Sequence, residues 1–291
     1  MKHIFLINSF TVKDKINNLI HNIKDYCVKN NINYEIEINN ENNSTEEILK
    51  KYKKTNYIII PIGGDGIINR TLNSIVNTKN ILGFIPHGTG NDFYKSVKKE
   101  FKKGINECDL VSINDKYFIN TACFGIDADV ANNKSTFKSK ILPKSQAYNY
   151  AVIKSFSSFK SRNFKIETNN EKYEGKYATI VVCNGGYYGS GYYINPHFKL
   201  NNNKIDVYFV EHLNKVNLAL LILKMKQGKH INDKRVKHLV TDKIIIKSDE
   251  KINANIDGES IENNKFEIKV KKNKINIFYD ENMIKEIKKA Q

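Results

Sequence analysis

Two glycine-rich segments of the sequence carry residues that suit phosphate chemistry. The first is Gly63-Gly64-Asp65-Gly66, and the second is Gly88-Thr89-Gly90-Asn91-Asp92. Because glycine has no Cβ, such loops can bring backbone N–H groups close to an anion at the positive end of a helix. With Asp65 and Asp92 but no loop lysine, this site would need a metal cation to accept a nucleotide polyphosphate. The alternative is a pair of ordinary glycine turns, in which Asp65 is a helix cap.

Each glycine segment lies between an apolar strand and a helical pattern. The strands are expected at residues 57–62 and 81–86. In a doubly wound sheet, the loops that follow parallel strands lie at the same carboxyl edge. The two glycine loops should therefore meet in one crevice. Asn8, at the end of a first strand expected at residues 2–8, should open onto the same edge. The phosphate-binding P-loop motif G-x-x-x-x-G-K-[ST] does not occur in the sequence. The first glycine loop also lacks the dinucleotide-binding motif G-x-G-x-x-G.

The pattern of the chain changes near residue 117. Before it, strands alternate with helices, which favours a parallel sheet. After it, strand-like runs follow one another with two helical insertions, at 146–159 and 216–226, which favours an antiparallel sandwich. We therefore expect an α/β domain with a Rossmann-like parallel sheet at 1–117 and a C-terminal antiparallel β-sandwich domain at 118–280, with a last strand at 275–279. A basic helix follows at 281–291.

Composition limits the classes of protein. The 291 residues carry a formal charge of +16, which favours polyanionic partners such as nucleic acid, nucleotides or an anionic membrane surface. No nucleic-acid motif is recognised, so nucleic acid is not expected as a partner. The four cysteines are far apart and suggest reduced thiols. With no signal peptide and no apolar run that could span a bilayer, a cytoplasmic protein is expected.

The paired motifs resemble a known family. Gly63-Gly64-Asp65-Gly66-x-x-Asn69 with Gly88-Thr89-Gly90-Asn91-Asp92-Phe93 is similar to the catalytic domain of the diacylglycerol kinase family, in its bacterial lipid kinase (YegS/BmrU-like) branch. The residues Asn184 to Gly191 and Asp257-Gly258-Glu259 follow in the family's order, so the resemblance covers nearly the whole chain. It implies an NAD kinase/diacylglycerol kinase-like fold and a C-terminal helix that packs back on the first domain.

The resemblance also implies roles for individual residues. In related kinases the glutamate that matches Glu259 is the general base toward the lipid hydroxyl, and Asp65 would organise the magnesium of ATP. Without the family, Glu259 would be a surface carboxylate after an Asp-Gly turn. The residues expected to bind the nucleotide are Asn8, Gly63, Gly64, Asp65, Gly66, Ile67, Ile68, Asn69, Thr89, Asn91 and Asp92.

A second magnesium site of the family is expected to be weak or lost. Relatives hold this structural ion through an aspartate that aligns with Asn202, flanked by the backbone carbonyls of Lys199 and Lys204. A neutral amide oxygen should hold a hard cation less tightly than a carboxylate. Asp109 stands where relatives carry an aspartate that is linked indirectly to the active-site metal, and the alternative is a cap at the domain junction.

The sequence therefore predicts an ATP- and Mg²⁺-dependent lipid kinase of phospholipid metabolism. Its substrate would be a membrane lipid with a hydroxyl group, such as diacylglycerol or phosphatidylglycerol, and the enzyme would attach peripherally to an anionic membrane. One alternative is an NAD kinase-like enzyme, although the Thr-Pro-Thr-Gly-Ser-like segment of that family is absent. Another is a basic, non-catalytic nucleic-acid- or membrane-binding protein. The sequence leaves the oligomeric state open, with a homodimer as one option.

Overall fold

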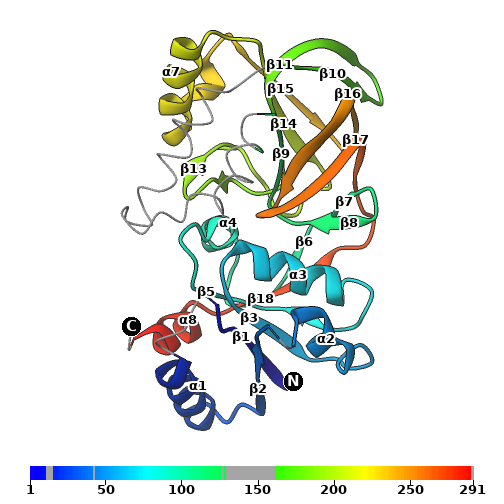
Figure 1. Ribbon diagram of the computed structural model, residues 1–291. Coiled ribbons are helices and arrows are strands. Elements are labelled where there is room, and N and C mark those ends of the chain that lie inside the picture. Colours follow the sequence, from blue (N-terminus) through cyan, green and yellow to red (C-terminus); the bar gives the residue numbers. More distant parts are fainter. Residues whose placement is uncertain (11–15, 42, 126–127, 129–160, 290–291) are drawn as a thin grey trace. The chain divides into compact units, whose positions relative to one another are not determined.

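The computed structural model describes residues 1–10, 16–41, 43–125, 128 and 161–289. The chain divides into two compact units (Figure 1). The first unit contains Met1–Cys108 and Lys274–Gln291, and the second contains Asp109–Asn273. The chain thus leaves the first unit once and returns to it near its end.

The first unit alternates strands with helices, as the sequence predicts. Its strands are β1 (His3–Asn8), β2 (Tyr34–Asn39), β3 (Ile58–Gly63), β4 (Ile81–Leu82), β5 (Ile85–Pro86), β6 (Gly104–Cys108) and β18 (Ile275–Tyr279). Its helices are α1 (Ile16–Lys29), α2 (Thr45–Lys50), α3 (Asp65–Ile75), α4 (Asp92–Glu100) and α8 (Glu281–Lys288).

These strands form one mostly parallel sheet. Its order is β2-β1-β3-β4-β18-β6, with β5 beside β3, and β6 alone is antiparallel to its neighbour β18. From β1 the chain moves outward to β2 and then returns to the other side of β1 as β3. The strand order therefore reverses between β1 and β3, and the carboxyl ends of these two strands are where ligands bind in open α/β sheets.

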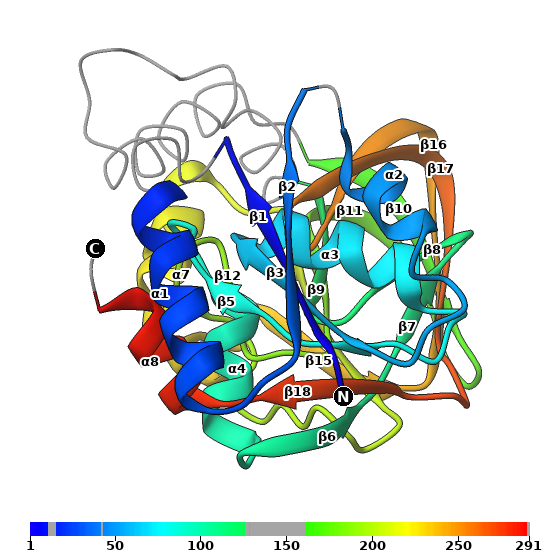
Figure 2. The ribbon, with the colours of Figure 1, turned by 90° about the horizontal axis from the view of Figure 1, so that it is seen from below.

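Local sequence explains how the helices cover this sheet. In α1, Leu19, Ile23 and Cys27 recur at helical spacing and are buried. Ser44 caps α2 by accepting a hydrogen bond from the backbone N–H of Glu47. Figure 2 shows α1 and α8 side by side on one face of the sheet and α2 and α3 on the other. The expected return of the C-terminal helix to the first unit is thus observed.

The second unit consists mainly of antiparallel strands. They are β7 (Val111–Ile113), β8 (Lys116–Phe118), β9 (Thr121–Gly125), β10 (Arg162–Thr168), β11 (Lys172–Cys183), β12 (Tyr187–Tyr188), β13 (Tyr192–Tyr193), β14 (Ile205–Glu211), β15 (Val236–Thr241), β16 (Lys243–Ile256) and β17 (Glu259–Val270). The helix α7 (Lys215–Lys226) and the 3₁₀ helix η3 (Lys229–Asn232) connect β14 to β15.

Most strands of the second unit share one large apolar core, and a second apolar cluster lies where β9, β11 and β14 meet α7. Their order is β15-β14-β11-β10-β16-β17-β7-β8, and β9 pairs with both β11 and β16. Inward-facing aromatic rings fill the interior, including Phe118, Phe124, Phe164, Phe209 and Phe266. This architecture confirms the predicted antiparallel, sandwich-like C-terminal fold.

The division of the chain differs from the predicted limits at residues 117 and 280. The first unit ends at Cys108, because β6 is the last strand of this segment to join the parallel sheet. The strand β18, expected in the sandwich, lies between β4 and β6 in the first unit. Its hydrogen bonds to β6 and β4 could not be inferred from local pattern, since these partners are far away in the sequence.

Two further expectations concern single elements. The strand expected at 81–86 is interrupted at Gly83, where a Cβ would lie 2.9 Å from Ile60 Cγ1, and forms the two short strands β4 and β5. The helix expected at 216–226 is α7. The helix expected at 146–159 lies outside the described residues.

Candidate active site

The candidate nucleotide site lies at the carboxyl ends of β1, β3 and β5. Asn8 ends β1 and Gly63 ends β3, and a Cβ placed on Gly63 would lie 3.5 Å from Asn8 Cβ. The Asn8 side-chain oxygen accepts a hydrogen bond from Phe10 N at 3.3 Å. His87, directly after β5, donates its backbone N–H to Gly63 O at 2.7 Å. The three strand ends are thus adjacent, as the parallel arrangement requires.

The two glycine loops touch through their backbones. A Cβ on Gly88 would lie 2.6 Å from Gly64 Cα, a distance that real Cβ atoms essentially never show. Gly64 itself has φ −90° and ψ −174°, an extended conformation open to any residue. Close approach therefore explains the glycine at position 88, whereas a Cβ on Gly64 would lie at an ordinary 3.4 Å from Gly88 Cα. The expected convergence of the two loops is confirmed.

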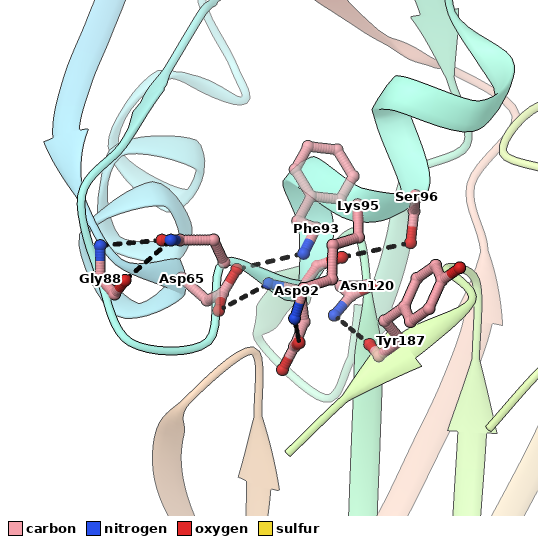
Figure 3. Close-up of polar contacts among 9 residues, drawn as sticks. Asp65, Gly88, Asp92, Phe93, Lys95, Ser96, Asn120 and Tyr187 are labelled. Atoms are coloured by element: carbon pink, nitrogen blue, oxygen red, sulfur yellow. Dashed lines mark hydrogen bonds and ion pairs between the residues drawn. The ribbon is translucent and has the colours of Figure 1, made fainter. Parts of the chain in front are cut away.

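Asn91 is the residue that bends the second loop into α4. It adopts a left-handed conformation with φ 51°, which asparagine tolerates better than most residues. Its side chain makes two hydrogen bonds with Gly88, one from Gly88 N to Asn91 Oδ1 and one from Asn91 Nδ2 to Gly88 O, both at 2.8 Å (Figure 3). These bonds close the loop into a compact ring that holds Gly88 against Gly64.

The carboxylate of Asp65 caps a helix to which Asp65 does not belong. Asp65 is the first residue of α3, yet its oxygens accept hydrogen bonds from Asp92 N and Phe93 N of α4, each at 3.1 Å (Figure 3). Such a carboxylate is stabilised by the positive end of the α4 dipole. The side chain therefore ties the first turns of two helices together. The cap suggested by the sequence exists, but on the neighbouring helix.

The amino end of α3 has no side-chain cap. Its N-cap is Gly64, which has no side chain to accept the first backbone N–H groups of the helix. Ile67 and Ile68 are buried against the core, so only their backbone could contact a nucleotide. Asn69 is also buried, and its side-chain oxygen accepts from Asn73 Nδ2 at 3.1 Å. In the first turn of α3, the backbone N–H groups are therefore the groups suited to bind phosphate.

The remaining residues expected in the first loops differ in exposure. Thr89 is exposed at the tip of the second loop. Asp92 is buried, and its carboxylate forms an ion pair with Lys95 at 3.0 Å (Figure 3). Asp92 thus lies beside the Asp65 carboxylate, which accepts from its backbone N–H. Two carboxylates and two amino ends of helices meet in this part of the first unit.

In the second unit, Asp257 and Gly258 form a two-residue hairpin turn between β16 and β17. Both have positive φ, 47° and 96°, as a type I′ turn requires. The Asp257 carboxylate is buried and accepts three backbone N–H groups, from Ile119 at 2.9 Å, Asn120 at 3.1 Å and Thr121 at 2.8 Å. The turn is therefore fixed to the segment that precedes β9.

Glu259 is the first residue of β17, directly after this anchored turn. Its backbone pairs with Ile256 across the hairpin, and the residue is partly exposed. Glu259 belongs to the second unit, whereas Asp65 belongs to the first. The structure thus places Glu259 at the start of a paired strand, and its role toward a substrate stays a prediction.

Asp109 anchors the loop that was expected to hold a structural magnesium. It is fully buried, and its Oδ2 accepts from Asn202 N at 2.8 Å and Asn203 N at 2.6 Å. The Asn202 side-chain oxygen accepts from Lys204 N at 3.0 Å and so takes part in the turn itself. Within the described residues, no group of three or more His, Cys, Asp or Glu side chains could hold a metal ion. Lys199 is exposed in the same loop.

Three residues contribute to these arrangements without having been predicted as site residues. Gly88 faces Gly64, Asp257 holds the turn before Glu259, and Asn184 donates its side-chain N–H to Ile119 O at 2.7 Å. The sequence contains the signal for Gly88, because this glycine comes after β5 as Gly64 comes after β3. Asp257 could be predicted as a turn residue, but its three partners lie more than a hundred residues earlier in the chain.

Comparison with known families gives matches over both units. Residues 2–116 match the diacylglycerol kinase catalytic domain, and residues 120–279 match the YegS C-terminal NAD kinase beta sandwich-like domain. A protein of Staphylococcus carnosus named "Putative lipid kinase" is 25% identical over 76% of this chain and 76% of its own length. The "Diacylglycerol kinase" of Bacillus subtilis is 25% identical over 69% of this chain and 71% of its own length.

Solved structures share the fold. The crystal structure of "a putative diacylglycerol kinase" from Bacillus anthracis superposes with a TM-score of 0.77 at 20% identity, covering 97% of this chain and 96% of that one. An NAD kinase from Archaeoglobus fulgidus, solved in complex with ATP, gives a TM-score of 0.53 at 14% identity over 99% and 98% of the two chains. With family matches across both units, the chain belongs to the diacylglycerol kinase catalytic-domain family, in its bacterial lipid kinase branch.

Proposed function

We propose that this protein is an ATP- and Mg²⁺-dependent lipid kinase that transfers the γ-phosphate of ATP to a hydroxyl group of a membrane lipid. Family membership supports a kinase, and the names of the relatives support a lipid acceptor. The observation that carries the proposal is the position of the amino end of α3 at the switch point of the sheet, with an N-cap, Gly64, that has no side chain. A neighbouring loop contacts it through Gly88.

Backbone N–H groups would bind the phosphates of ATP. The first N–H groups of a helix lack partners within the helix, and the helix dipole favours a negative charge there. A glycine N-cap lets a phosphate approach this backbone closely. Binding of ATP to a protein of similar fold, the Archaeoglobus fulgidus NAD kinase, is consistent with this assignment.

The residues fit a magnesium ion that is bound mostly by phosphate and water. Each oxygen of Asp65 accepts a backbone N–H group, and a carboxylate oxygen can have more than one partner. Mg²⁺ commonly uses one or two carboxylates together with substrate phosphates, and does not need a cage of protein ligands. Asp65, with Asp92 beside it, would hold the ion. When bound, the ion neutralises charge on the β- and γ-phosphates.

Glu259 is the proposed general base. Its carboxylate would take the proton from the lipid hydroxyl while that oxygen bonds to the γ-phosphorus and the bond to the bridging oxygen breaks, which releases ADP. A positioned carboxylate contributes roughly 10² to 10⁴ in rate to such a step. The hairpin turn held by Asp257 supports this role, because a base must be fixed in orientation.

The experiment is phosphoryl transfer from γ-labelled ATP to a total lipid extract, with the products separated by chromatography. Glu259→Gln should lower kcat roughly 10²-fold or more, with little change in the KM for ATP. Glu262→Gln, on the same strand and exposed, is the matched control and should act like the parent. Transfer by Glu259→Gln at the parental rate would refute the base. Transfer to NAD with none to lipid would refute the lipid acceptor.

A further inference from the structure

The helix α7 carries apolar side chains on two opposite faces, and one of these faces packs on the sandwich. Leu218, Leu221 and Met225 are 1%, 4% and 7% exposed and face inward. Val216, Leu220 and Leu223 are 70%, 50% and 66% exposed. Their spacing of four and three residues places them on one stripe, opposite the buried face.

This stripe is unusual for the described part of the molecule. Eight large apolar side chains are strongly exposed among the described residues, and three of them belong to the stripe on α7. Single exposed apolar residues need no explanation, but a contiguous apolar patch marks a surface that binds something. Figure 1 shows α7 lying outside the strands of its own unit. The patch therefore lies on an outer surface of the second unit.

The charges around α7 are positive. Between residues 211 and 240 the chain carries seven lysines and arginines but two acidic residues, Glu211 and Asp233. Glu211 pairs with Lys237, and Asp233 pairs with Lys224 and Arg235. The exposed Lys226 lies one turn beyond Leu223 on the same stripe, and the exposed Lys229 follows it. The apolar stripe thus ends in an excess of positive charge.

We propose that this face of α7 docks on an anionic phospholipid membrane, with Val216, Leu220 and Leu223 inserted among the head groups. The inference rests on the proposed function, in which the acceptor is a membrane lipid. A helix of 12 residues is about 18 Å long, so it would lie in the plane of the interface. No helix of the described residues is long and apolar enough to cross a membrane. Lysines at the rim would attract the anionic head groups.

Sedimentation with lipid vesicles, without nucleotide, tests the inference. The full chain should bind vesicles of mixed phosphatidylcholine and phosphatidylglycerol, and bind pure phosphatidylcholine more weakly. The double variant Leu220→Gln, Leu223→Gln should bind the mixed vesicles at least about tenfold more weakly. Val28→Gln on α1, where Val28 is 72% exposed, is the matched control and should bind like the parent. Lys226→Gln with Lys229→Gln should lower affinity for the mixed vesicles alone.

Each outcome decides the inference. Thermal unfolding of the variants, compared with the parent, shows that they are folded. Equal vesicle binding by the parent and the double variant, or no binding by the parent, overturns the docking surface. A double variant that changes from dimer to monomer, with unchanged vesicle affinity, would assign the face to a second copy of this chain and also overturn it.

The test is separate from the kinase test. Phosphoryl transfer to lipid dispersed in detergent micelles needs no membrane docking, so the double variant should keep at least half of the parental rate there. If micellar transfer fails while vesicle binding depends on α7, then the proposed function is wrong and the docking surface stands. If transfer in micelles succeeds and the double variant on α7 binds vesicles as the parent does, the docking surface is wrong.

Discussion

Gly64 and Gly88 face each other so closely that a Cβ on Gly88 would lie 2.6 Å from Gly64 Cα. The same Cβ would lie 3.1 Å from Asn91 Oδ1 and 3.2 Å from Gly64 N. Two of these three neighbours are backbone atoms, which cannot rotate away as a side chain can. The pair therefore sets how near the two loops of the first unit can approach, and so the shape of any phosphate site between them.

Replacing Gly88 by alanine should separate these loops. We expect Gly88→Ala to lower the free energy of unfolding by about 1–3 kcal/mol, the usual cost of overpacking, and to raise the KM for ATP. Gly175→Ala is the control, because a Cβ there would meet Tyr177 ring atoms at an ordinary 3.8 Å. Chemical denaturation and steady-state kinetics measure both effects. A Gly88→Ala protein with parental stability and KM would contradict the close contact.

Asp65 should affect both the fold and the reaction. Asp65→Asn keeps an oxygen that can accept one N–H of α4 but loses the charge, so we expect a loss of about 1 kcal/mol in stability. Because Asp65 is also the proposed magnesium contact, phosphoryl transfer should fall at least about tenfold. Melting temperature and the transfer rate at several magnesium concentrations give the two quantities.

Asp280→Asn separates these two effects. Asp280 also caps a helix, because it is the N-cap of α8 and its Oδ1 accepts from Asn282 N at 2.9 Å and Met283 N at 3.1 Å. Asp280→Asn should lower the free energy of unfolding by a similar amount and leave the rate of phosphoryl transfer near that of the parent. If both variants lose activity equally, then Asp65 acts through the fold alone, and its role toward magnesium is wrong.

Much of the first unit follows from local sequence. The buried stripe of α1, the Ser44 cap of α2 and the glycines after β3 and β5 are each visible within a few residues. These signals predict where elements begin and end and which edge of the sheet carries the loops. They do not predict which side chain of one loop contacts the next.

The remaining features depend on partners that are distant in the chain. Asp65 is separated from Phe93 by 28 positions, and Asp257 from Ile119 by 138. Either carboxylate could have capped its own helix or turn, and nothing local excludes that choice. The strand β18 was expected in the sandwich for the same reason. An apolar strand pattern does not indicate which strands it pairs with.

Asp257 should stabilise the second unit and, through the turn, position Glu259. Asp257→Asn can keep the left-handed conformation, but a neutral oxygen replaces a carboxylate that accepts three N–H groups. We expect a loss of about 1–3 kcal/mol in the free energy of unfolding and a lower kcat. Asp115→Asn, in an exposed turn, should change neither quantity. Denaturation curves that coincide for Asp257→Asn and the parent would refute the anchoring role.

His230 should make stability depend on pH. The imidazole is 2% exposed, its Nε2 lies 2.9 Å from Ile194 O, and burial lowers its pKa from 6.5 to about 4. Between these two pKa values the unfolded chain binds a proton that the folded chain does not, so stability rises with pH from about 4 to 6.5. The full effect of this one group is about 3 kcal/mol.

Removing the titrating ring should flatten that dependence. His230→Gln can still donate to Ile194 O and does not titrate, so its free energy of unfolding should change less between pH 4.5 and 6.5 than that of the parent, by roughly 2 kcal/mol. His21→Gln is the control, because the His21 side chain is 74% exposed on α1 and should leave the slope unchanged. Urea titrations at several pH values measure the slope. An identical slope in His230→Gln and the parent would show that His230 does not carry the pH dependence, whatever other groups contribute to it.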